Sequence, residues 1–288
     1  MIAYTSKGRR STAGLRWRRH RLLLAALLMI VPLTGLVAAP QAELGPRWEA
    51  HDPDSTRTLD HGDWGTFLDR YLVTDDPSGV NLVPYGDVTE SDRGLLTGYL
   101  NYLQDVPVSE LNRDEQLAYW INLYNAATIE LILDNYPVDS IRDIKPNIFA
   151  SGPWDMEFLE VEGESVSLND VEHRIIRPVW QDNRIHYVVN CASIGCPNLY
   201  PEPLTALNGD RVFDESVVSY TNHPRGVRFD GGQLVLSEIY NWYVSDFEGT
   251  VEGVIEHLIE YVPGPTSRRL RAFTGRPRYE YDWSLNQP

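Results

Sequence analysis

The chain has 288 residues, of which 42% are hydrophobic and 23% charged, and its formal net charge at pH 7 is −16. This composition excludes a disordered chain and indicates a folded globular protein. The acidity argues against binding to nucleic acids or anionic lipid surfaces, because both partners require a basic footprint.

The first forty residues combine a basic stretch with an apolar one. Seven Lys and Arg residues lie between Lys7 and Arg21, and an apolar run follows from Leu22 to Ala39. This order is typical of a signal peptide or an N-terminal signal anchor, whose basic end stays in the cytoplasm. We therefore expect an extracytoplasmic protein, periplasmic or secreted. We expect contact with the membrane only through residues 22–39, which would anchor the protein in the inner membrane if the leader were not cleaved.

The leader also changes the charge of the mature protein. Residues 1–40 contain no acidic residue, so the remainder has 18 basic and 41 acidic residues and a net charge of −23. We interpret this as a solvated acidic surface. Residues 41–60 form a polar arm, and residues 61–288 form a single globular domain, since no repeat and no long linker divides them.

Helical spacing dominates the first half of the domain. The apolar residues of Trp64–Tyr71 and Leu95–Leu103 predict two amphipathic helices. The clearest helix runs from Arg113 to Asn135, with Asn112 as its N-terminal cap and Tyr136-Pro137 after its last turn. It has too many apolar residues for a surface helix, and we expect it at the centre of the fold.

Two polar residues lie in this predicted central helix. Asn122 and Asn125 are one turn apart, and buried amides require partners. Together with Cys196, they are the candidate binding residues. The alternative is structural hydrogen bonding to a neighbouring loop.

Shorter elements follow along the chain. They alternate between helices and hairpins, which indicates the α+β class: a mostly helical single domain with its long central helix packed against a small antiparallel sheet. The expected elements are a hairpin at 156–161 and 165–168, a helix at 169–177 ended by Pro178, a buried strand at 184–190, a helix at 210–220, a hairpin at 227–229 and 234–236, a helix capped by Ser237 and a helix at 251–261.

The residues that could carry chemistry lie around the predicted buried strand. Cys191 follows that strand, where a rigid scaffold presents reactive groups. A cysteine nucleophile needs a base, here His186 or His173, and an orienting acid such as Glu172 or Asp282. Because side chains alternate along a strand, residues 186 and 191 would meet only if the strand ended or bent between them.

Other interpretations of the same residues are open. Cys191 and Cys196 are the only cysteines, and in an oxidising compartment they also fit a structural disulfide. His186 also fits a hydrogen-bonded core histidine. Zinc is a weaker alternative because the spacing matches no zinc signature, and we expect no metal and no cofactor.

Several motifs resemble the domain of unknown function 547 family (DUF547), in order over roughly residues 60–286. The matching segments are Tyr119–Ala126, Tyr136–Asp143, Ser167–His173, His186–Pro197, Ser237–Phe247 and Tyr281–Asn286. The family is named for lacking an assigned function, so the resemblance implies no reaction. Its long helix beside a small sheet looks distantly similar to the papain and transglutaminase group of thiol hydrolases. This sequence departs from that group, because its central helix begins with Asp114, Glu115 and Gln116 where a nucleophilic cysteine would stand.

Two functional hypotheses result. The first is a thiol-dependent hydrolase or transferase acting on a peptide or amide-like bond, with Cys191 as nucleophile, His186 as base and Glu172 as the orienting or binding acid. The second is a non-catalytic envelope binding or scaffold protein in which Cys191 and Cys196 form a disulfide. Its ligand, a peptide or small molecule, would lie in an aromatic groove supplied by Trp120, Tyr124, Tyr240, Trp242 and Tyr243, residues whose helical spacing is also typical of a core.

Overall fold

The structure, a computed structural model, describes residues 39–288. The predicted leader therefore lies outside the described residues, apart from its last two positions. Residues 39–288 belong to one compact unit in which helices predominate and the strands are short, which confirms the α+β class. The helices are α1 (Gly62–Tyr71), α2 (Glu90–Gln104), α3 (Arg113–Asn135), α4 (Arg177–Trp180), α5 (Gly209–Thr221), α6 (Ile239–Trp242), α7 (Val251–Tyr261) and α8 (Gly264–Arg271).

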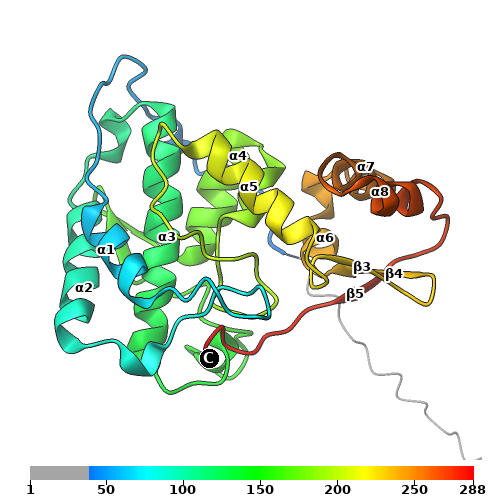
Figure 1. Ribbon diagram of the computed structural model, residues 1–288. Helices are drawn as coiled ribbons and strands as arrows, with labels where there is room; N and C mark the ends of the chain where they lie inside the picture. Colours follow the sequence, from blue (N-terminus) through cyan, green and yellow to red (C-terminus); the bar gives the residue numbers. More distant parts are fainter. Residues whose placement is uncertain (1–38) are drawn as a thin grey trace, which may run out of the picture. The chain divides into compact units, whose positions relative to one another are not determined.

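Helix α3 is the centre of the larger hydrophobic core, as its sequence predicts. Sixteen of its 23 residues are buried, so side chains on every face of the helix contact protein. The backbone N–H of Glu115 donates to Oδ1 of Asn112 at 3.0 Å, which is the expected cap. Helix α2 packs along one side of α3, and the segment before α4 packs along another (Figure 1).

A short hairpin follows α3. Strands β1 (Leu159–Val161) and β2 (Glu164–Val166) pair antiparallel around Glu162 and Gly163, both of which have positive φ angles. The sequence predicts this hairpin correctly, because Gly163 adopts the left-handed conformation without a steric penalty.

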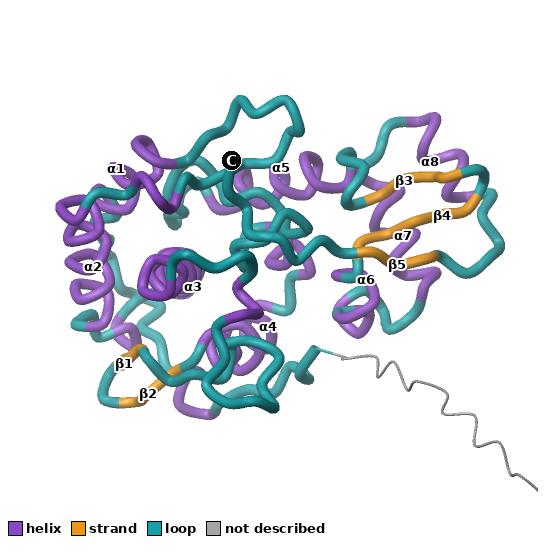
Figure 2. Tube along the Cα trace, turned by 90° about the horizontal axis from the view of Figure 1, so that it is seen from below, coloured by secondary structure: helices purple, strands orange, loops and turns teal. Residues whose placement is uncertain are grey.

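The second hydrophobic cluster is built on a three-stranded sheet. Strand β4 (Gln233–Ser237) lies between β3 (Val227–Asp230), which is antiparallel to it, and β5 (Arg278–Glu280), which is parallel to it. Helices α7 and α8 cover one face of this sheet (Figures 1 and 2). Strand β5 was not predicted, since its alternating charged residues give no signal of a buried strand.

The predicted strand at residues 184–190 is wrong. Its first part is a 3-10 helix, Asn183–Tyr187, whose start is capped by Oδ1 of Asp182, which accepts from the backbone N–H of Arg184 at 2.8 Å. Ile185 and Tyr187 are fully buried, as the sequence indicates. A short apolar run does not by itself distinguish a strand from a buried helical turn.

The predicted end of a helix at Pro178 is also wrong. A π-helical segment, Asp170–Ile176, continues directly into α4, and Pro178 lies in the first turn of α4. A proline removes one intrahelical N–H but does not always end a helix, and here the irregular π-helical backbone before Pro178 continues through it.

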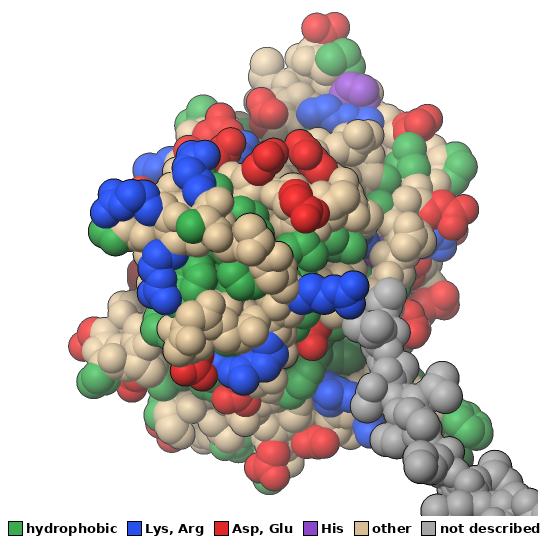
Figure 3. Space-filling view, turned by 90° about the vertical axis from the view of Figure 1, so that its right-hand side faces the viewer, with side chains coloured by type: hydrophobic (Ala, Val, Ile, Leu, Met, Phe, Trp, Pro, Cys, Tyr) green, Lys and Arg blue, Asp and Glu red, His purple; other side chains and the backbone are tan. Residues whose placement is uncertain are grey.

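One side of the folded protein carries charged groups of both signs. On the side that carries β3, β4 and α8, acidic and basic side chains lie among each other (Figure 3). The last turn of α8 alone contributes Arg268, Arg269 and Arg271. Among residues 39–288, none of the helices is both long and apolar enough to cross a bilayer.

Replacing Leu123 with Ala tests the central position of α3. Leu123 is fully buried, and its truncation should lower the free energy of unfolding by about 2 to 5 kcal/mol. Urea denaturation followed by circular dichroism measures this. Leu207, which is 99% exposed, provides the control, and Leu207→Ala should change stability by less than about 0.5 kcal/mol. Equal effects of the two changes would contradict a core centred on α3.

Candidate functional site

The central helix holds two loops through its buried amides. Nδ2 of Asn125 donates to the carbonyl of Val188 at 2.8 Å, and Oδ1 accepts from the N–H of Asn190 at 2.8 Å. Asn122 makes the same pair of bonds to the backbone of Leu204, at 2.8 and 3.0 Å. These two candidate binding residues bind protein backbone, which is the alternative that the sequence left open.

The cysteines lie in a small loop that starts at the Asn125 bond. We call residues 191–196 the cysteine loop. Asn190 fixes its shape, because Oδ1 accepts from the N–H of Ala192 at 2.8 Å and Nδ2 donates to the carbonyl of Pro197 at 2.7 Å. Ala192 has a φ of 57°, the left-handed conformation that turns the chain tightly.

The two sulfur atoms of the cysteine loop face each other. Sγ of Cys191 lies 3.0 Å from Sγ of Cys196, 3.2 Å from Oγ of Ser193 and 3.1 Å from the hydroxyl of Tyr281. Both cysteines are free thiols. The hydrogen bond with Cys196 and burial raise the pKa of Cys191 well above its ordinary value. Burial would also raise the pKa of Cys196, but its hydrogen bonds with Cys191 lower it overall.

A C-terminal segment lies directly against the cysteine loop. The N–H groups of Ile194 and Gly195 donate to the carbonyls of Ser284 and Asp282, each at 2.8 Å. A Cβ at position 195 would lie 2.8 Å from the backbone of Asp282, so this close approach requires glycine. Tyr220 supports the loop from the other side, donating its hydroxyl proton to the carbonyl of Gly195 at 2.7 Å.

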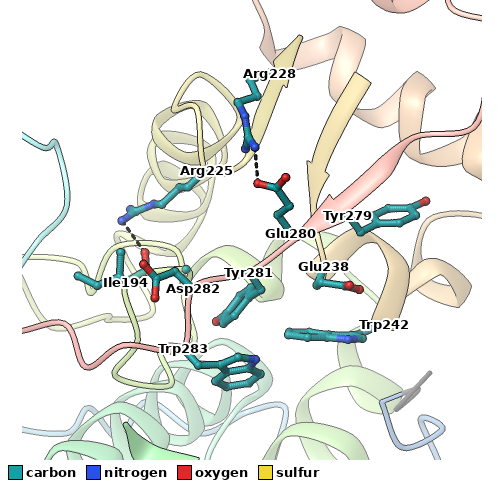
Figure 4. A pocket seen from close by; sticks show the side chains of 11 residues that line it. Ile194, Arg225, Arg228, Glu238, Trp242, Tyr279, Glu280, Tyr281, Asp282 and Trp283 are labelled. Carbon is teal, nitrogen blue, oxygen red and sulfur yellow. Dashed lines mark hydrogen bonds and ion pairs between the residues drawn. The ribbon is translucent and has the colours of Figure 1, made fainter. Parts of the chain in front are cut away.

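A pocket of about 580 Å³ lies where these segments meet (Figure 4). Ile194 and Gly195 of the cysteine loop form part of its wall. The rest comes from the turn before β3, from the end of β4 with α6, and from residues 279–283, and includes Arg225, Glu238, Trp242, Tyr281 and Trp283. Tyr281 thus lines the pocket and contacts Cys191.

The predicted histidines and acid lie in a different group of side chains. We call Glu172, His173, Arg177, His186 and Asp246 the buried charge cluster. Nε2 of His186 donates to Oδ2 of Asp246 at 2.8 Å, and Arg177 forms an ion pair with the same carboxylate at 2.7 Å. Nη1 of Arg177 also donates to Nδ1 of His173 at 2.9 Å. The cluster joins the π-helical segment, the 3-10 helix at 183–187 and the turn after α6.

Burial and charge fix the ionisation of this cluster. Burial would raise the pKa of Asp246, but hydrogen bonds from His186 and Arg177 hold it well below its usual range. Burial would likewise raise the pKa of Glu172, but the neighbouring His173, His186 and Arg177 lower it overall. Burial lowers the pKa of His173, which fits a neutral ring that accepts from Arg177.

The structure does not join the predicted nucleophile to a predicted base. In the described part of the chain, no histidine nitrogen lies within hydrogen-bond distance of Cys191, whose partners are Cys196, Ser193 and Tyr281. Of the predicted catalytic residues, Glu172, His173 and His186 come together, with Nδ1 of His186 3.9 Å from Oε1 of Glu172. Tyr124 is hydrogen-bonded to Glu172 at 3.2 Å. Asp282, the other acid considered, lies at the pocket.

Comparison with known protein families gives one result. Residues 108–220 match the family described as Protein of unknown function, DUF547. This part of the chain belongs to DUF547. Searches of curated proteins and of solved structures found no match to the chain.

The DUF547 region contains only part of the site. It includes α3, the cysteine loop and four members of the buried charge cluster, and it ends before Arg225, Asp246 and Tyr281. Sequence reasoning did not assign Arg177, Ser193, Arg225 or Tyr281 to the site. The signal for Tyr281 was its place in a motif that resembles DUF547, but the sequence gave no reason to place it beside Cys191. No group of three or more His, Cys, Asp and Glu side chains within residues 39–288 could hold a metal ion.

Replacing Asp246 with Asn tests the buried charge cluster. The Arg177 side chain is 2% exposed. Asp246→Asn leaves this buried guanidinium without its carboxylate partner, and the free energy of unfolding should fall by about 3 kcal/mol. Because folding depresses the pKa of Asp246, this stabilisation is present above the unfolded pKa of about 3.9 and is lost as the pH falls through the folded value. Urea denaturation between neutral and acidic pH should therefore show the difference between wild type and variant shrinking below about pH 4.

Asp210 supplies the matched control for this experiment. It also pairs with an arginine, Arg184, at 3.2 Å, but its side chain is 94% exposed. Asp210→Asn should change stability by less than about 1 kcal/mol. A loss for Asp246→Asn no larger than this would contradict a structural role for the cluster.

Oxidation tests the proximity of the two sulfur atoms. With oxidised glutathione as oxidant, both thiols should lose their protons, a disulfide should form between them, and the two electrons released should reduce glutathione disulfide to two thiols. A bridge closing this six-residue loop should raise the free energy of unfolding by about 2 kcal/mol. Intact mass spectrometry and urea denaturation measure the two effects, with Cys196→Ser as control. A mixed disulfide that persists on Cys191 would contradict the observed pairing.

Proposed function

We propose that this protein is a non-catalytic binding protein that holds a small ligand in the pocket beside the cysteine loop. The observation that supports this most directly is the pocket itself, whose volume of about 580 Å³ lies in the range typical of small-molecule sites. Its wall combines aromatic side chains with a few polar groups, the usual composition of such sites.

The aromatic wall supports a binding role. Trp242, Tyr281 and Trp283 contact one another with ring centroids 4.6 to 5.4 Å apart, and all three remain partly exposed. Partly exposed aromatic rings that line a cavity provide contact area without a large entropy loss on binding. Of the aromatic residues expected from sequence, only Trp242 lines this pocket, and Trp120, Tyr124 and Tyr240 are buried in the core.

The cysteine pair fits a supporting role in this proposal. Ile194 and Gly195 lie between the two cysteines and form part of the pocket wall. A bridge between Cys191 and Cys196 would hold that wall in one conformation, and a rigid wall reduces the entropy that binding loses.

The thiol-dependent hydrolase is the second candidate and remains a hypothesis. In its favour, the sulfur of Cys191 contacts Tyr281, which lines the pocket. The binding role has more support, because Cys191 has a raised pKa and no imidazole partner, whereas a nucleophilic cysteine needs a base and a thiolate. The search of solved structures found no match, so it adds no support for the analogy to papain-like hydrolases.

An extracytoplasmic location is part of the same proposal. It rests on the order of basic and apolar residues in positions 7–39. In an oxidising compartment the cysteine pair would be held as a disulfide.

Filling the pocket tests the binding role. Ile194→Trp places a large ring in the pocket wall, and fragment-sized aromatic and polar compounds that bind the wild type should lose at least about tenfold in affinity. Ligand-observed NMR with a chemically mixed fragment set measures this. Leu207→Trp, at an exposed position away from the pocket, should leave binding unchanged. Cys191→Ala should weaken binding without abolishing it, because the cysteine pair only supports the wall.

Two results would overturn the proposal. One is that no fragment binds the wild type at all. The other is that the fragments bind Ile194→Trp as well as they bind the wild type. Turnover of a peptide or amide substrate that disappears in Cys191→Ala would favour the hydrolase instead.

A further inference from the structure

We infer that the ligand of this pocket is a neutral saccharide, whose ring lies on the aromatic wall while its hydroxyl groups bind Arg225, Glu238 and Asp282. This inference rests on the proposed binding function and specifies the class of ligand. It depends on three features of the pocket: the packing of its rings, its free polar groups and its charge.

The three rings form one continuous apolar patch. The ring of Tyr281 lies 4.6 Å from that of Trp283 and 4.8 Å from that of Trp242, with interplanar angles of 51° and 54°. Figure 4 shows the three side chains along one side of the pocket. A pyranose ring has an apolar face of C–H groups, and such a face packs against the negatively polarised face of an aromatic ring.

Arg225 offers hydrogen-bond donors beside this patch. Its Nη1 donates to the carbonyl of Ile194 at 3.2 Å and its Nη2 to Oδ1 of Asn198 at 2.6 Å, and each nitrogen retains a further N–H. No carboxylate within residues 39–288 lies within 4.0 Å of this guanidinium. Burial lowers the pKa of Arg225, which reflects its removal from water without a counter-ion.

Two carboxylates offer acceptors. Glu238 accepts from Nδ2 of Asn241 at 2.9 Å, and Asp282 accepts from the N–H of Ser284 at 2.9 Å. Neither forms an ion pair with any residue in the described part of the chain. In contrast, Arg228 and Glu280 at the same pocket pair with each other. The pocket therefore has both free donors and free acceptors, which suits the hydroxyl groups of a sugar because each can donate and accept.

Charge argues against the other classes of small ligand. An anion would meet two free carboxylates in a protein whose residues 41–288 have a net charge of −23. A quaternary ammonium group requires aromatic rings that surround a space for the cation. Here the rings pack against one another at 4.6 to 5.4 Å and leave no such space between them. A neutral polyhydroxylated ring can hydrogen-bond to Arg225, Glu238 and Asp282 without charge repulsion and without an aromatic cage.

Saturation-transfer difference NMR tests this inference on the full mature chain. The probes are three neutral disaccharides, maltose, cellobiose and N,N′-diacetylchitobiose, with glycine betaine and glucuronate as charged comparisons. At least one disaccharide should give a saturable signal that is strongest at the C–H protons of its ring, because these lie on the aromatic wall.

Variants locate the binding. Trp242→Ala should weaken the disaccharide at least about tenfold, as expected for an aromatic anchor. Glu238→Gln, a conservative change at a partly exposed position, should weaken disaccharide binding about threefold. This variant keeps the test decisive if Trp242→Ala fails to fold. Tyr102→Ala and Glu90→Gln replace an exposed aromatic and an exposed acid on α2, away from the pocket, and should leave binding unchanged.

The outcomes separate this inference from the binding proposal. If none of the three disaccharides binds, or if only glycine betaine or glucuronate binds, the saccharide inference is overturned. Fragments that still bind the wild type and are lost in Ile194→Trp would leave the pocket as the binding site. Disaccharide binding that is unaffected by both Trp242→Ala and Glu238→Gln would show that the sugar lies elsewhere and would also overturn the inference.

Discussion

The side-chain amides of Asn122 and Asn125 hold the loops of this protein to its central helix. Each amide pairs with a backbone N–H and a backbone carbonyl that would otherwise be buried without a partner. An unsatisfied buried polar group costs about 1 to 3 kcal/mol, so these bonds strongly favour one loop conformation. The cysteine loop begins directly after the Asn125 bond, and its position against the pocket follows from that of α3.

The polar residues of the fold separate into two groups with different physical roles. The buried charge cluster is almost fully removed from water, and its charges are paired with each other through Arg177 and Asp246. The pocket retains unpaired charge and exposed aromatic surface. The buried network is held by the ion pair of Arg177 with Asp246, although Nδ1 of His186 is buried without a hydrogen-bond partner. Unpaired groups on a cavity wall, in contrast, are available to a ligand. The histidines belong to the buried group and do not line the pocket.

Local sequence signals predicted the elements with regular periodicity or clear capping. The cap at Asn112, the turn at Glu162-Gly163 and the amphipathic spacing of α7 each have one physical interpretation, and the structure contains all three elements. The segment at 184–190 has no such signal, because burial of Ile185 and Tyr187 is compatible with a strand and with a helical turn. Strand β5 depends on pairing with β4, about forty residues earlier, which no local pattern reports.

The site was predictable only in part for the same reason. The sequence indicated that Cys191 lies in a constrained loop and that Cys196 is near it, since few residues separate them. It did not indicate that Tyr281 contacts that sulfur atom, because ninety residues separate the two. The histidines were grouped with Cys191 by proximity in sequence, and the 3-10 helix at 183–187 instead directs His186 toward Asp246.

The approach of residues 278–286 to Gly195 has a consequence for the order of folding. These residues follow every other part of the pocket in the chain, yet they supply Tyr281, Trp283 and the carbonyls that bind the cysteine loop. A chain that emerges from its N-terminus can form α3 and most of its core first, because most of those contacts lie within the preceding sequence, and Leu285 joins this core last. The pocket closes only when the last strand has paired with β4, so the binding that we propose would become possible late in the folding of each molecule.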